Sequence, residues 1–177
     1  MIGAGRRLLL AGTALLGLLC AGCGYALQGT KIEGIPDYIS AIAVDPFENR
    51  TQQPEIEQRV TEQVAAELAK RSRFKLVSVK EDANALLTGV VTEFRNNPVQ
   101  FTDEGRASRV EAVVTIQATL RDLTNDEILW SQPGLVFREQ FDVSAEEQEF
   151  FDQTGAALDD IGRGAALALI TSIFEGF

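Results

Sequence analysis

An alternation of apolar and polar residues in the middle of the chain is the feature that most limits its fold. From Ala112 to Leu120, apolar side chains take every second position, and mainly polar side chains stand between them. This period of two predicts a β-strand with one covered face and one wet face, which is typical of an antiparallel sheet packed on one side only. Other elements of the chain must therefore cover the apolar face.

Two stretches with helical spacing can supply that cover. In residues 55–72, the apolar side chains Ile56, Val60, Val64 and Leu68 recur at every fourth position, and residues 150–174 carry apolar side chains three or four apart. Both patterns predict amphipathic helices. The economical packing lays both helices on the apolar face of the sheet.

The remaining patterned segments predict further strands, at residues 39–44, 74–79, 85–95 and 127–141. Asn96-Asn97-Pro98 is expected to interrupt the third of these, and Pro133-Gly134 to bend the last. Residues 98–109 are predicted to form a projecting hairpin. The predicted fold class is α+β, with two helices on one face of a small, mostly antiparallel four- to five-stranded sheet, in the order strand-helix-strand-strand-strand-strand-helix.

The amino-terminal residues have the layout of an export signal. Arg6 and Arg7 precede the apolar run of residues 8–19, and the small residues Ala21 and Gly22 follow it. The run is about a dozen residues long, which is shorter than the ~20 that a helix needs to cross a bilayer. A secretory signal is therefore favoured over a permanent transmembrane anchor.

Two cysteines close this segment. The sequence Cys20-Ala21-Gly22-Cys23 resembles the lipobox of a bacterial lipoprotein, with Cys20 where leucine is usual. We expect cleavage before Cys23, which would discard Cys20, and lipidation of Cys23. The alternative is ordinary cleavage nearby, with Cys23 free or paired. A redox or metal pair is disfavoured because the cysteines lie at the edge of an export signal.

The predicted organisation has three parts: a lipoprotein signal peptide at residues 1–22, a lipidated leader at residues 23–38 and a single α+β domain at residues 39–177. Acidic residues outnumber basic ones 26 to 16, so nucleic acid is not an expected partner. The chain contains no histidine, which removes the commonest general base and metal ligand. Most familiar hydrolytic chemistry is therefore excluded, and we expect no catalytic residue, no metal and no cofactor.

Several carboxylates are candidates for chemistry. Asp45 and Glu48 lie at a predicted strand end, where sites often form. Asp159 and Asp160 are adjacent on a predicted helix, where neighbouring side chains diverge, so they are expected to be solvated charges. A periplasmic enzyme that uses carboxylates alone stays open as a third hypothesis.

The predicted hairpin carries two basic residues, Arg106 and Arg109, in an otherwise acidic chain. Arginine suits an anionic group such as a lipid phosphate. The alternative is that these arginines form surface ion pairs with nearby acidic residues. Elsewhere, the small residues of Gly162-Arg163-Gly164 are expected to allow close helix packing, and Trp130 is expected to pack in the core or at an interface.

An ordered set of segments resembles one family. The sequence after the lipobox, CGYAL, is followed by IAVDPFENRT (residues 42–51), EIEQRVTEQV (55–64), DANALLTG (82–89), LRDLTNDEILW (120–130) and FREQF (137–141). Together these resemble the lipopolysaccharide-assembly lipoproteins of the LptE family. The strand-turn FENRT also occurs in curli-secretion and penicillin-binding-protein-activator lipoproteins.

The resemblance implies an outer-membrane lipoprotein on the periplasmic side that binds lipopolysaccharide and catalyses no reaction. Its implied partner is the translocon β-barrel, an LptD-like protein, which it plugs and helps to assemble. The resemblance makes Arg106 and Arg109 the candidate lipopolysaccharide contacts. An alternative function is an outer-membrane lipoprotein that regulates a cell-wall synthase or a secretion channel.

Overall fold

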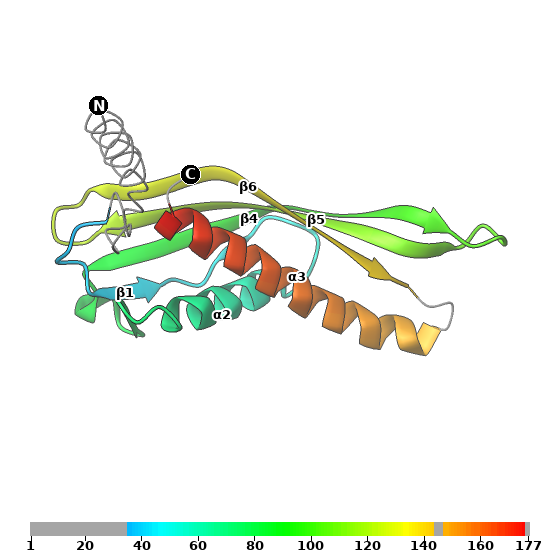
Figure 1. Ribbon diagram of the computed structural model, residues 1–177, viewed down its shortest axis with the longest axis horizontal. Helices are drawn as coiled ribbons and strands as arrows, with labels where there is room; N and C mark the ends of the chain where they lie inside the picture. The colour runs from blue at the N-terminus through cyan, green and yellow to red at the C-terminus, as the bar shows by residue number, and fades with distance from the viewer. Residues whose placement is uncertain (1–34, 144–146, 176–177) are drawn as a thin grey trace, which may run out of the picture. The chain divides into compact units, whose positions relative to one another are not determined.

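The structure is a computed structural model that describes residues 35–143 and 147–175. Of the two α-helices in these ranges, the carboxyl-terminal one is the longest element, and the other lies between the second and third strands (Figure 1). The elements are β1 (Ala41–Val44), β2 (Glu48–Asn49), α2 (Ile56–Ala69), β3 (Lys75–Val77), the 3₁₀ turn η2 (Lys80–Asp82), β4 (Ala85–Phe101), β5 (Ala107–Asp122), β6 (Ile128–Asp142) and α3 (Glu147–Glu175).

The strands form one mixed sheet in the order β3-β1-β4-β5-β6, and β2 also pairs with β4. The meander β4-β5-β6 is antiparallel, as predicted. Strand β1 pairs in parallel with both β3 and β4, and β2 is parallel to β4. The prediction of a mostly antiparallel sheet of four to five strands is thus corrected: the described residues form a mixed sheet of six strands. A two-residue strand such as β2 has no periodicity to detect, and the crossover through α2 is what allows β1 and β3 to run parallel.

Both helices lie on the same face of the sheet, which confirms the predicted packing (Figure 1). Helix α2 buries one stripe, Ile56, Val60, Val64 and Leu68, each at most 1% exposed. Burying such a side chain stabilises the fold by about 1.5–3 kcal/mol. The stripe meets the apolar face of the sheet and the buried side of α3, so one core lies between the layers.

Two glycines allow α3 to approach its neighbours closely, as predicted for this segment. A Cβ atom at Gly162 would lie 3.4 Å from the Cβ atom of Arg59 on α2. A Cβ atom at Gly164 would come within 2.9 Å of three ring carbons of Phe137 on β6. Helix α3 therefore packs on α2 through one glycine and on the sheet through the other.

Strand β4 continues to Phe101 and does not stop at Asn96-Asn97-Pro98, so this part of the prediction was wrong. Proline is tolerated on edge strands and at bulges. Among the described strands, β4 has a partner only on its β5 side beyond Val91, and its register shifts beside Pro98. Pro133-Gly134, where a bend was predicted, coincides with a register shift between β5 and β6, which is typical of a β-bulge.

The packed part of the chain already includes Ile35, which is 5% exposed and lies four residues before the predicted domain start. Ile39 is buried in the same core. The hydroxyl of Tyr38 donates a hydrogen bond to Asp122, at the end of β5, and Asn125 Nδ2 donates to the Tyr38 hydroxyl at 2.7 Å. These contacts attach the start of the domain to the β5–β6 turn.

Candidate functional site

The predicted site residues fall into two groups. Cys23 lies outside the described residues. Arg106 and Arg109 lie at the far end of the β4–β5 hairpin, which extends beyond β1 and α2 (Figure 1). The tip is a tight turn in which Thr102 N donates to Arg106 O at 2.7 Å and Gly105 N donates to Thr102 O at 2.9 Å. Gly105 has a φ of 77°, a left-handed conformation that glycine adopts without steric cost.

The two arginines have different surroundings. Arg106 is exposed in the turn, and none of the described residues forms an ion pair with it. Arg109 Nε donates to Asp142 Oδ1 across the β5–β6 pair at 2.7 Å, and this bond raises the pKa of Arg109 above its ordinary value. Arg106 thus keeps its guanidinium available, whereas Arg109 already has a carboxylate partner.

Strand register brings a second pair of arginines together that sequence reasoning missed. On the face of the sheet away from the helices, Val113 lies opposite Arg95 on β4 and opposite Arg138 on β6. Arg95 is paired with Glu93, while Arg138 is exposed and forms no ion pair within the described ranges. Only the pairing of three strands places these residues in one row, so no local sequence signal could have identified them.

Two valines give the same region an apolar component. Val113 is half-buried between the two arginines, and Val136 on β6 is 44% exposed in the next row, opposite Thr115. The face of the sheet away from the helices is called the open face below. Its part nearest the hairpin tip therefore offers guanidinium groups beside apolar side chains. Such a surface can bind a ligand that carries both anionic groups and hydrocarbon.

The part of the open face next to β1 and β2 contains a hollow of about 420 Å³. Its floor comes from β4, β5 and β6, and its rim comes from Asp45 and Pro46 in the β1–β2 connection and from Glu48, the first residue of β2. The lining residues are Asp45, Pro46, Glu48, Thr88, Gly89, Val90, Gln117, Ala118, Thr119, Ser131, Gln132 and Pro133. The two carboxylates noted at a strand end in the sequence thus lie together at this hollow.

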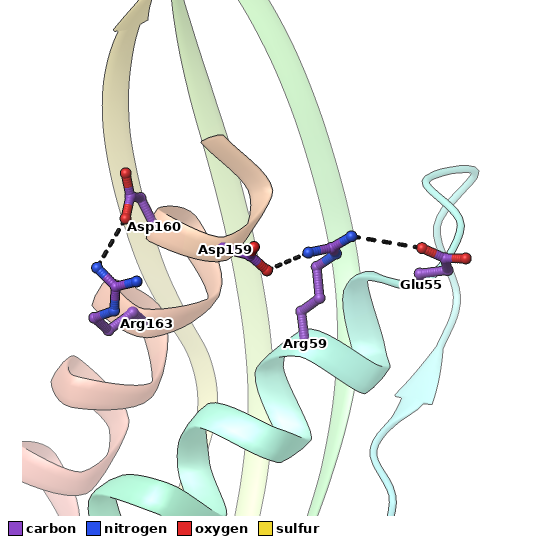
Figure 2. Close-up of polar contacts among 5 residues, drawn as sticks. All are labelled: Glu55, Arg59, Asp159, Asp160 and Arg163. Carbon is purple, nitrogen blue, oxygen red and sulfur yellow. Dashed lines mark hydrogen bonds and ion pairs between the residues drawn. The ribbon is translucent and has the colours of Figure 1, made fainter. Parts of the chain in front are cut away.

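The paired carboxylates on α3 have structural partners (Figure 2). Asp159 forms an ion pair with Arg59 of α2, and Arg59 also reaches Glu55 at 3.6 Å. Asp160 pairs with Arg163 on the same helix at 2.8 Å. The expectation that Asp159 is only a solvated charge was wrong, because close helix packing at Gly162 brings α2 within its reach.

Other candidates add little chemistry. Trp130 is half-buried against the core, as predicted. In the described ranges, no group of three or more His, Cys, Asp or Glu side chains is placed to hold a metal ion. None of the helices in these ranges is long and apolar enough to cross a membrane.

Comparison with known proteins gives one sequence match and several similar folds. The sequence model of the LptE family, described as lipopolysaccharide-assembly, matches residues 39–172. Nothing among the curated proteins matches the sequence. The solution structure of lipoprotein B of Nitrosomonas europaea is similar over 85% of this chain and 90% of its own, with 14% identity and a TM-score of 0.55. A crystal structure from Xanthomonas campestris is similar over 80% and 88%, with 12% identity and a TM-score of 0.53.

Proposed function

Because this chain belongs to the LptE family of lipopolysaccharide-assembly proteins, we propose that it binds lipopolysaccharide on the open face of its sheet. The observation that carries this proposal is the row formed by Arg95, Val113 and Arg138. Lipopolysaccharide presents phosphate groups beside acyl chains. Guanidinium groups suit phosphate, and the valines suit hydrocarbon.

The hairpin tip extends this surface. Arg106 is exposed at the tip, and Arg109 lies on β5 between the tip and the row at Val113. Asp142 already neutralises Arg109, so Arg106 and Arg138 supply the cationic groups without an ion-pair partner among the described residues. The phosphate groups of the ligand would therefore bind these two arginines in preference to Arg109.

The same open face suits a second role, as a plug in a β-barrel of the LptD kind. The face has hydroxyl and amide side chains such as Thr119 and Gln117 as well as valines, and the described helices leave it uncovered (Figure 1). A large barrel encloses a water-filled lumen, where a half-polar surface is acceptable. The protein would thus act by binding, support assembly of the barrel and catalyse no reaction.

An acylated Cys23 would hold the domain at the periplasmic side of the outer membrane, after removal of residues 1–22. Stable anchoring takes two or more acyl chains, because one chain gives only marginal membrane binding. Mass spectrometry of the mature protein tests this part: a diacylglyceryl thioether on Cys23 is expected, and an unmodified Cys23 would contradict it.

Co-purification from detergent-solubilised envelopes tests the function as a whole. The full chain should bring down one large outer-membrane β-barrel protein, and depletion of the chain should impair assembly of that barrel. Lipopolysaccharide should bind the purified chain. If depletion leaves barrel assembly intact and no barrel protein comes down, the proposal fails.

A further inference from the structure

The connection between β1 and β2 is fixed in place by contacts with β4 and α2. The ring of Phe47 is 3% exposed and packs over Gly89, and Phe47 N donates to Thr61 Oγ1 of α2 at 2.9 Å. Asn49 accepts hydrogen bonds from Thr51 and donates to Glu57 at 2.7 Å. These contacts account for Phe47 and Asn49, but the side chains of Asp45 and Glu48 take no part in them.

Both of these carboxylates line the hollow on the open face. Among the described residues that line it, they are the only ionisable ones. Glu48 has a partial partner in Arg50, at 3.1 Å, in an ion pair whose side chains are more than 60% exposed. Asp45 forms no ion pair within the described ranges, although its backbone N–H is fixed to Leu87 O at 3.0 Å. The rim is therefore anionic and held in position.

The floor offers hydrogen-bonding groups in register. Thr88, Thr119 and Ser131 lie opposite one another across β4, β5 and β6. Their mutual hydrogen bonds are long, 3.5 Å from Thr88 Oγ1 to Thr119 O and 3.3 Å between Thr119 Oγ1 and Ser131 Oγ. These hydroxyl groups can exchange such weak bonds for contacts with a ligand.

We propose that this hollow docks a lysine- or arginine-bearing segment of the barrel protein, an inference that rests on the proposed function. An ammonium or guanidinium group donates to carboxylates and hydroxyl oxygens, which are the groups that Asp45 and Thr119 present. A phosphate-bearing ligand would be repelled by the same rim. The two halves of the open face thus have separate ligands: lipopolysaccharide on the arginine row and the partner polypeptide in the hollow.

The rigid rim favours this contact because little conformational entropy is lost on binding. The fixed backbone of Asp45 and the packed ring of Phe47 hold the rim in one arrangement before the partner arrives. Neutralising both carboxylates removes the attraction without changing the size of the side chains.

The test compares three forms of the full, lipidated chain in co-purification with the barrel from solubilised envelopes. The variant Asp45→Asn with Glu48→Gln should recover roughly tenfold less barrel protein than wild type, as expected for the loss of charge pairs at an interface. The control Glu62→Gln with Glu127→Gln removes the same charge at exposed sites on α2 and in the β5–β6 turn, and it should bind like wild type. Raising the salt concentration should weaken the wild-type complex more than the variant complex.

A second variant, Ser131→Lys, places an ammonium group on the floor of the hollow and should weaken the same complex without altering the rim.

Equal barrel recovery by wild type and both hollow variants would overturn the inference. Loss of binding to lipopolysaccharide micelles, with barrel recovery unchanged, would also overturn it, because the hollow would then be a lipopolysaccharide site. Failure of the wild-type chain to recover any barrel would instead refute the proposed function.

Discussion

The ring of Phe47 occupies the space that a side chain at position 89 would need. A Cβ atom built on Gly89 lies 2.6 Å or less from three carbons of that ring. The contact holds the β1–β2 connection against β4, so glycine at position 89 is a requirement of packing.

Replacing Gly89 with alanine should therefore destabilise the domain by about 2–3 kcal/mol, in the range of overpacked cores. Urea unfolding followed by circular dichroism would measure this. Gly134→Ala is the matched control, since a Cβ atom there meets nothing within 4 Å, and it should change the free energy of unfolding by less than about 0.5 kcal/mol. Equal stability of the two variants would show that Phe47 can move aside freely.

Two glycines of α3 should respond to alanine in opposite directions. A Cβ atom at Gly155 would meet nothing within 4 Å, so Gly155→Ala should stabilise the helix by about 0.5–1 kcal/mol through backbone entropy. Gly164→Ala should instead destabilise the domain by about 1–3 kcal/mol, because its Cβ atom would collide with the ring of Phe137. Thermal melting distinguishes the two, and stabilisation by both would mean that α3 does not pack on β6 at this point.

The bond between Tyr38 and Asp122 predicts sensitivity to acid. Asp122 is buried, yet the hydrogen bond from Tyr38, with smaller contributions from Thr124 and Asn125, lowers its pKa below the ordinary value of 3.8. The folded state thus favours the carboxylate more than the unfolded state does. This contribution to stability is present above the ordinary pKa and is lost as pH falls through the lower folded-state pKa.

Tyr38→Phe removes the main donor, so the pKa of Asp122 should rise and acid unfolding should begin at a higher pH than in wild type. A carboxyl ¹³C titration and an acid unfolding curve would measure the two effects. Asn125→Ala, which removes a weaker donor, should produce a smaller shift in the same direction. An unchanged Asp122 titration in Tyr38→Phe would contradict this assignment.

For lipopolysaccharide binding, the existing ion pairs predict an order of effects among the arginines. Arg138→Glu and Arg106→Glu should each weaken binding about tenfold or more, since each reverses a charge without a described partner. Arg109→Glu should have a smaller effect, because Asp142 already neutralises Arg109. Lys80→Glu, on η2, serves as a control of equal charge change. Binding to labelled lipopolysaccharide micelles at two salt concentrations would measure this order. Equal effects of all four changes would mean that binding depends only on the net charge of the protein.

Periodicity was enough to predict much of this fold from the sequence. The stripe that ends in Leu68 and the alternation that ends in Leu120 predicted α2 and β5, because each pattern reports a face that the structure buries. Strand β2 and the extension of β4 past Pro98 were missed. Both depend on which strands are neighbours, and neighbours are set by tertiary pairing.

The candidate site was also predicted only in part from the sequence. The turn chemistry around Gly105 located the hairpin tip and Arg106 correctly. By contrast, Arg95 and Arg138 are 43 positions apart (138 minus 95) and meet only through β5. Local sequence could show neither that row nor the hollow beside Asp45.

The pairing of β1 also constrains the order in which the chain folds. Both of its partner strands come later in the chain: Ile42 pairs with Leu76 and with Ala85, across loops of more than 30 residues. Closing such loops costs entropy, whereas β4, β5 and β6 meet through short turns. We expect the meander to form first and to act as the template on which β1, α2 and β3 assemble. An emerging chain would thus complete its amino-terminal half only after the hairpin is in place.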